Sequence, residues 1–198
     1  EMLRSLVGSE MCIRDSCGPA TQFPYAQERI YTPPDATLES YQSLLHMLRV
    51  ERTVLVQPSV YGTDNRAMLA ALKSSPQQFR GVAVISSNPQ DVSDNELADL
   101  HAAGVRGLRC NIVDIADKSA GLPIVQLRNL AKRIQPLGWH LELLMHVNEY
   151  PDLAKTFADF PVDLVFGHFG YAHAKHGIFN QGFQGLLDLM KSERAWVK

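Results

Sequence analysis

The stretch Trp139–Gly170, WHLELLMHVNEYPDLAKTFADFPVDLVFGHFG, decides how the rest of the chain folds. Two apolar runs, Leu141–Val147 and Val162–Phe166, are separated by a segment that we interpret as a helix. His146 stands near the end of the first run, and His168 follows the second. In a sheet of parallel strands joined by helices, reactive groups gather at the carboxyl ends of the strands. The stretch therefore predicts that both histidines face one space.

Two readings of His146 and His168 are open on the residues alone. They can form a metal-binding or acid–base pair at neighbouring strand ends. They can equally be core histidines that hydrogen-bond to their surroundings. For a single histidine, the core reading would be favoured. Because two histidines stand at equivalent points of consecutive strand–helix units, the two readings are equally supported.

The same strand-and-helix alternation extends over the chain on both sides of this stretch. Thr37 is placed to cap a first helix, and Ser93 with Glu96 forms a capping box for another. The expected strands are Thr53–Val56, Phe79–Ile85, Val105–Val113, His140–Val147, Val162–His168 and a last one beginning at Ala195–Lys198. The expected helices are Leu38–Val50, a helix after Asp64, one from Ser93 to about Ala103, Pro123–Leu137, Tyr150–Phe160 and Phe183–Ser192.

This alternation predicts an α/β fold with a parallel sheet and right-handed crossovers. No glycine-rich phosphate loop follows any strand, which argues against an open sheet that binds nucleotides. Polar residues at the strand ends favour a (β/α)8 TIM-type barrel, whose mouth is built from many strands; they are Gln57, Arg109, Asn111, His146 and His168. A full barrel needs ~250 residues, so we expect an incomplete one.

Composition points to a small-molecule partner. The 198 residues include 19 basic and 21 acidic side chains, and the formal net charge of -2 gives no general attraction for nucleic acid or an anionic membrane. No apolar run approaches the ~20 residues that span a bilayer. Cys12, Cys17 and Cys110 show neither metal-ligand spacing nor a disulfide framework, which indicates a reducing, cytoplasmic setting. The sequence does not indicate an oligomeric state.

The first residues do not fit the pattern that follows. Residues 1–16 have one short apolar run and no period, and we interpret them as a foreign or unstructured leader. Residues 17–198 form the expected barrel domain.

Several separated motifs resemble the amidohydrolase-related (amidohydrolase 2) family of metal-dependent hydrolases. The resemblance covers about Cys17–Lys198 and implies a TIM-barrel fold. The motifs that carry it are GPA at 18–20, FPYA at 23–26, ER at 28–29, YTP at 31–33, DNRAM at 64–68, GVRGLR at 104–109 with Asn111, LGWH at 137–140, and GH at 167–168 with Gly170.

The resemblance implies a divalent metal, with zinc as the first candidate. The family's barrel has a His-x-His pair on its first strand, single histidines on the fifth and sixth, and an aspartate on the eighth. His146 and His168 match the fifth and sixth positions as metal ligands, and His168 also as a catalytic residue. Ile13, Arg14 and Asp15 stand where the pair would fall. We therefore expect the first-strand region to be replaced, and most of strand seven and all of strand eight to be missing.

The resemblance also implies two substrate-binding residues, Arg109 and Tyr31. Arg109 would hold a carboxylate through two parallel hydrogen bonds, and the alternative is a salt bridge to Asp114 or Glu142. Tyr31 can instead simply pack. Metal-free lactonases of the family carry a tyrosine where this chain has Leu144 and an acidic residue where it has His146, which favours a metal-using relative.

The function implied is hydrolysis of a lactone, or of another cyclic or amide-like carboxylate, by metal-activated water. The alternatives are a related metal-dependent decarboxylase and a non-catalytic remnant that only binds ligands. Because the His-x-His pair of the first strand and the aspartate of the eighth strand are absent, we expect the 198-residue chain to be inactive by itself.

Overall fold

The computed structural model describes residues 20–29, 31–34, 36–86, 91–113 and 121–198. The leader expected at residues 1–16 lies outside these ranges, and so do positions 13–15, where the family's first-strand histidines would fall.

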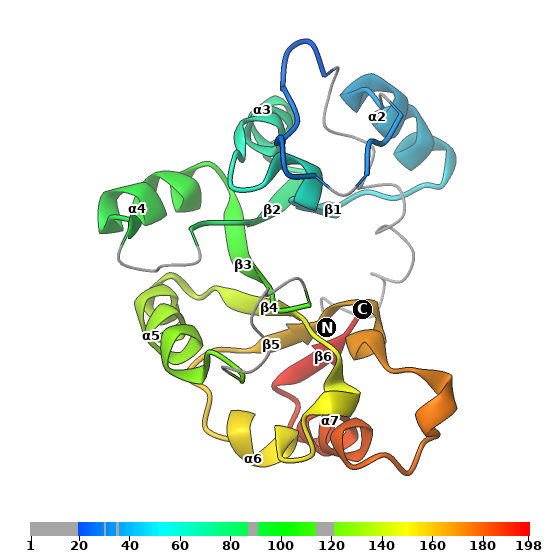
Figure 1. Cartoon of the computed structure of the whole chain (residues 1–198). Helices are drawn as coiled ribbons and strands as arrows, with labels where there is room; N and C mark the ends of the chain where they lie inside the picture. Colours follow the sequence, from blue (N-terminus) through cyan, green and yellow to red (C-terminus); the bar gives the residue numbers. More distant parts are fainter. Residues whose placement is uncertain (1–19, 30, 35, 87–90, 114–120) are drawn as a thin grey trace. The chain divides into compact units, whose positions relative to one another are not determined.

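The sheet contains six described strands in the order β1-β2-β3-β4-β5-β6, and the pairs β1–β2, β3–β4, β4–β5 and β5–β6 are parallel (Figure 1). Every strand except β5 begins at the residue that the sequence predicts. The strands are β1 Thr53–Val56, β2 Phe79–Ala83, β3 Val105–Asn111, β4 His140–Leu144, β5 Leu164–Phe166 and β6 Ala195–Val197. A run of parallel strands in sequence order confirms the α/β expectation.

Helices alternate with these strands. The α-helices are α2 Leu38–Met47, α3 Arg66–Ser74, α4 Asp94–Ala102, α5 Ile124–Ile134, α6 Leu153–Phe157 and α7 Gln181–Lys191. The 3-10 turns are η1 Ser59–Tyr61, η4 Gln135–Leu137, η5 Val147–Glu149, η6 Gly167–Tyr171 and η7 Ala174–His176. The described helices include none long and apolar enough to cross a membrane.

Side-chain caps begin two helices where the sequence places them. The Thr37 hydroxyl accepts a hydrogen bond from the Ser40 amide, and the Ser93 hydroxyl accepts one from Glu96. These caps satisfy amide groups that have no partner within the first turn. Local sequence therefore determines where α2 and α4 start.

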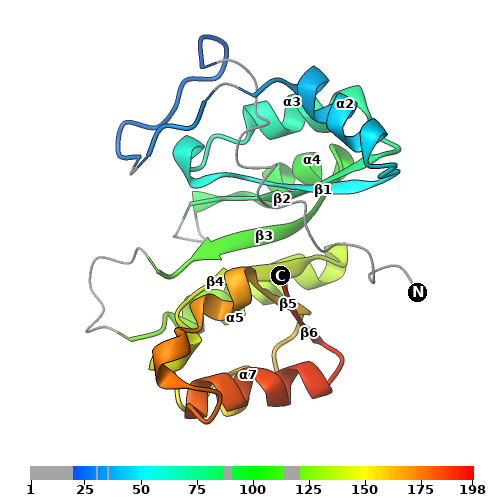
Figure 2. The same ribbon diagram turned by 90° about the vertical axis from the view of Figure 1, so that its right-hand side faces the viewer.

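The described residues divide into two compact units, the first up to residue 86 together with 92–106, and the second chiefly Gly107–Lys198. In the first unit, α2 and α3 lie over the β1–β2 pair (Figure 2). The Tyr41 hydroxyl on α2 lies 2.9 Å from the Thr53 hydroxyl on β1. Gly81 on β2 leaves room for Leu72 and Met68 of α3, so the helix approaches the strand closely.

In the second unit, α6 and α7 lie side by side (Figure 1). A side chain on Gly185 of α7 would stand 3.1 Å from the Ala154 amide nitrogen, so the glycine permits this approach. Phe157 of α6 packs edge-on against Phe166 of β5, with ring centroids 6.1 Å apart. Both phenylalanines are buried, and they hold the helices against the strands that carry the candidate site.

β2 ends earlier than the sequence predicts. Its expected end was Ile85, but the strand stops at Ala83. The Asn65 side chain accepts a hydrogen bond from the Val84 amide and donates one to the Val84 carbonyl. This side chain takes the place of a neighbouring strand, so regular pairing ends there.

β5 and α6 are also shorter than predicted. β5 ends at Phe166 rather than His168 because the chain turns into a left-handed conformation, with φ of 53° at His168 and 54° at Phe169. α6 spans Leu153–Phe157 rather than Tyr150–Phe160. Proline at 151 and at 161 restricts the backbone on either side of this helix.

Candidate active site at the ends of β4 and β5

A buried carboxylate between two cations forms the charged part of the site. Arg109 on β3 pairs in register with Glu142 on β4, so their side chains project from the same face of the sheet. The Arg109 Nε atom lies 3.9 Å from Glu142 Oε1, beyond hydrogen-bond distance. The Glu142 side chain is 2% exposed and that of Arg109 11%. The ion-pair alternative for Arg109 is thus present in the structure.

Lys198 is the second cation. Its Nζ atom donates a hydrogen bond of 2.7 Å to Glu142 Oε2, and its side chain is 22% exposed. The Lys198 amide donates to the Phe166 carbonyl, and its carbonyl accepts from the Phe169 amide. These bonds fix Lys198 beside the turn that carries His168.

The two predicted histidines pack against a shared residue, Tyr171. The His168 and Tyr171 ring centroids are 4.9 Å apart, and those of His146 and Tyr171 are 5.3 Å apart. His146 Nδ1 lies 3.4 Å from the Tyr171 carbonyl oxygen. The structure therefore brings His146 and His168 to the same aromatic side chain, both of them half-buried.

The turn that places His168 and Tyr171 is strained. Four consecutive residues, His168 to Tyr171, have positive φ angles of 53°, 54°, 62° and 47°. Only Gly170 among them adopts this region without a steric cost. Strained backbone of this kind is often found at functional sites.

A third imidazole, that of His173, lies against His146. His173 is exposed, and its ring stacks on that of His146 with centroids 5.5 Å apart and an interplanar angle of 9°. The His173 amide donates to the Asn148 side chain, which fixes the loop in place. His176 is exposed, with its ring 6.3 Å from that of His173. Sequence reasoning missed the stack, because loop residues after a strand carry no periodic signal.

The described residues do not fit a metal site by themselves. Within the ranges that the structure describes, no three His, Cys, Asp or Glu side chains are grouped so that they could hold an ion. Catalytic zinc needs three protein ligands, and the family's positions on this chain supply two. The described residues therefore do not form a complete catalytic zinc site.

Tyr31, the second predicted substrate residue, packs in the first unit. It lies with Phe23 and Tyr25 against Val60, Tyr61 and Ala67. This environment corresponds to the packing alternative, and the substrate role of Tyr31 stays a prediction.

Cys110, next to Arg109, is expected to be unreactive in the folded chain. Burial, and secondarily the negative charge of Glu142, raises the pKa of its thiol from 9.0 to about 12, although the residue keeps some exposed surface. A higher pKa leaves less thiolate near neutral pH, and the thiolate is the form that reacts. In peptide-resolved mass spectrometry, iodoacetamide should label Cys110 at least about a hundredfold faster in urea than in buffer. Equal rates would contradict the buried thiol.

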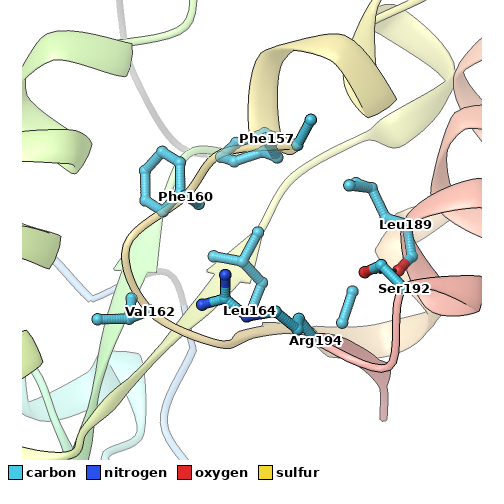
Figure 3. Close-up of a pocket in the computed structure, with 9 residues that line it drawn as sticks. Phe157, Phe160, Val162, Leu164, Leu189, Ser192 and Arg194 are labelled. Atoms are coloured by element: carbon cyan, nitrogen blue, oxygen red, sulfur yellow. Dashed lines mark hydrogen bonds between the residues drawn. The ribbon is translucent and has the colours of Figure 1, made fainter.

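A small pocket lies at the opposite ends of the strands. Its lining includes the apolar side chains Phe157, Val162 and Leu164 together with Ser192 and Arg194 (Figure 3). Val162 and Leu164 stand at the amino end of β5. In a barrel of parallel strands this end generally serves stability rather than chemistry.

Comparison with known proteins agrees with this arrangement. The amidohydrolase (Amidohydro_2) family model matches residues 13–198, and the chain belongs to this family. The fold is accordingly an incomplete TIM-type barrel. A more distant amidohydrolase from Burkholderia multivorans, 19% identical with a TM-score of 0.60, shares the fold, and one of its crystal structures holds zinc.

Among characterised relatives, the chain is similar to two lactone hydrolases. It is 37% identical over 186 residues to the 2-pyrone-4,6-dicarboxylate hydrolase of Comamonas testosteroni, covering 91% of this chain and 58% of the relative. It is 31% identical over 181 residues to the 4-sulfomuconolactone hydrolase of Hydrogenophaga intermedia, with the same coverage. The chain thus spans somewhat over half the length of these proteins.

A solved structure is also similar. It is a probable 2-pyrone-4,6-dicarboxylic acid hydrolase from Acinetobacter baumannii with citric acid bound, 28% identical to this chain. The TM-score is 0.77, and the match covers 92% of this chain and 67% of that protein.

Proposed function

We propose that the chain is part of a hydrolase that opens lactones bearing a carboxylate or another anionic group. The observation that carries the proposal is that Arg109 near the end of β3, His146 just after β4 and His168 just after β5 belong to one unit, and these strands are neighbours. The two lactone hydrolases most useful for comparison act, by their names, on a pyrone dicarboxylate and a sulfomuconolactone. These substrates share a lactone ring and an anionic group.

Arg109 binds the anionic group in this proposal. Its planar guanidinium donates in a fork that matches the two oxygens of a carboxylate. Glu142 lies against one edge of the guanidinium at 3.9 Å, which limits the directions in which the group can turn. Arg109 thereby orients the lactone ring without taking part in bond breaking.

His168 acts on water in this proposal. A neutral imidazole accepts the proton of a water molecule as its oxygen adds to the lactone carbonyl carbon. The ring carbon–oxygen bond then breaks, and the proton returns to the departing oxygen, which gives a hydroxy acid or its keto form. Tyr171 packs on both imidazoles and holds their rings in place.

A divalent metal, with zinc as the first candidate, remains part of the proposal for the whole protein. Such an ion would supply a polarised carbonyl and a more acidic water. With the ion bound, His146 and His168 would be two of its ligands, so His168 would hold the ion instead of accepting the water's proton. At least one more ligand would have to come from outside the described residues. A cytoplasmic location is likewise a proposal.

The test is binding and turnover of 2-pyrone-4,6-dicarboxylate by the 198-residue chain. We expect calorimetry to detect binding and the pyrone absorbance to stay constant, because the metal-ligand set is incomplete. Arg109→Met should weaken binding at least about tenfold, since it removes a charge-assisted pair of hydrogen bonds.

Lys191→Met is the matched control, because it removes a positive charge from an exposed pair on α7. It should leave binding unchanged. Equal affinity of the Arg109→Met and wild-type chains, or no binding at all, would refute the carboxylate site. Sustained ring opening would refute the expected inactivity.

A further inference from the structure

We propose that Lys198 is a second anion-binding residue beside Arg109, and that the buried carboxylate of Glu142 positions both cations in one carboxylate site. The inference rests on the proposed function and adds to it a second cation and the residue that holds the two together.

The first observation is that two cations from separate parts of the chain meet at one carboxylate. Arg109 comes from β3 and Lys198 follows β6, yet both side chains lie against Glu142 on β4. They reach opposite oxygens of the carboxylate, Oε1 and Oε2 respectively. Glu142 is nearly inaccessible, whereas both cations keep part of their side chains exposed, so a ligand meets the cations and not the carboxylate.

The second observation is the charge balance. Arg109 and Glu142 together carry no net formal charge, so this pair alone attracts an anion weakly. The Lys198 ammonium brings the three side chains to a formal charge of +1. An anion at the exposed side therefore gains attraction from Lys198 that the pair cannot provide.

The third observation is the incomplete pairing of Glu142. Its Oε1 atom is buried and has no hydrogen-bond partner among the described residues. A buried ion cluster whose carboxylate has an unpartnered oxygen costs desolvation free energy, and apolar side chains in place of the whole cluster would often be as stable. Orienting two cations for a ligand is a role that accounts for this cost.

A purely structural ion cluster makes a different prediction from a binding site. If the cluster only stabilises the sheet, substitutions that leave the chain folded should not change affinity for a carboxylate. If Glu142 only repels a nearby anion, its removal should tighten binding. If Glu142 positions the cations, removing its side-chain oxygens should weaken binding, although a negative charge has been lost.

The experiment measures calorimetric affinity for 2-pyrone-4,6-dicarboxylate in five variants, with circular dichroism confirming that each is folded. We expect Lys198→Met and Glu142→Leu to weaken binding at least about tenfold. Lys198→Arg should stay within about threefold, because the charge is kept. The affinity of Glu142→Gln should likewise stay within about threefold or become tighter, because the amide oxygen of the glutamine still accepts the hydrogen bond from Lys198.

The fifth variant, Arg109→Met, separates this inference from the proposed function. If Arg109→Met loses binding and Lys198→Met does not, the second cation is refuted and the Arg109 site stands. If Glu142→Leu binds as tightly as wild type, the positioning role is refuted. If neither Arg109→Met nor Lys198→Met changes the affinity, or the wild-type chain does not bind, both proposals are refuted. Should Glu142→Leu not fold, the affinities of Lys198→Met and Lys198→Arg decide whether Lys198 is a second anion-binding residue.

Discussion

Replacing Glu142 by leucine is expected to lower the free energy of unfolding by ~3–5 kcal/mol. The substitution leaves Arg109 and Lys198 largely buried, with side chains 11% and 22% exposed, and without the carboxylate between them. Two like charges then face each other in surroundings that screen them less than water does. Urea denaturation followed by circular dichroism measures the loss.

The double variant Glu142→Leu with Lys198→Met should recover only part of this loss. It removes one cation and the repulsion between the two, whereas Arg109 is still left without its carboxylate. The control is Asp163→Asn, which breaks the exposed pair with Arg194 at 3.3 Å and should cost no more than ~1 kcal/mol. If Glu142→Leu costs as little as the control, the carboxylate is not the centre of the cluster.

The strand positions were predictable because each strand is a short apolar run bounded by polar or turn-forming residues. Strand ends were less predictable, because side chains elsewhere set them. Asn65 ends β2 from a position 19 residues earlier in the chain. The left-handed turn after β5 uses residues other than glycine at positive φ, which local sequence preferences do not indicate.

The candidate site was predictable in part. Polar residues at strand ends pointed to Arg109, His146 and His168. Glu142 was considered only as an alternative partner of Arg109, since a single acidic residue inside an apolar run does not reveal its role. Lys198 was missed, because its place beside Glu142 depends on the pairing of β5 with β6, and sequence spacing does not give that register.

Gly182 is expected to be the least replaceable position near the histidines. A Cβ atom there would stand 1.9 Å from the Val147 carbonyl oxygen and 3.0 Å from that of Tyr150. Both are backbone atoms of the segment that follows His146, so neither can move away as a flexible side chain would. We expect Gly182→Ala to destabilise the chain by ~3 kcal/mol or more, because overpacking against backbone forces the helix and the turn apart.

Urea denaturation checks this expectation, and the NMR signals of the His146 ring report on the displaced turn. Gln181→Ala is the matched control, since Gln181 is the exposed neighbour at the start of α7 and its replacement should change stability by no more than ~0.5 kcal/mol. A Gly182→Ala chain as stable as this control would mean that α7 does not press on the turn. The stack of His146 and His173 would then lack the support that the close approach of α7 gives it.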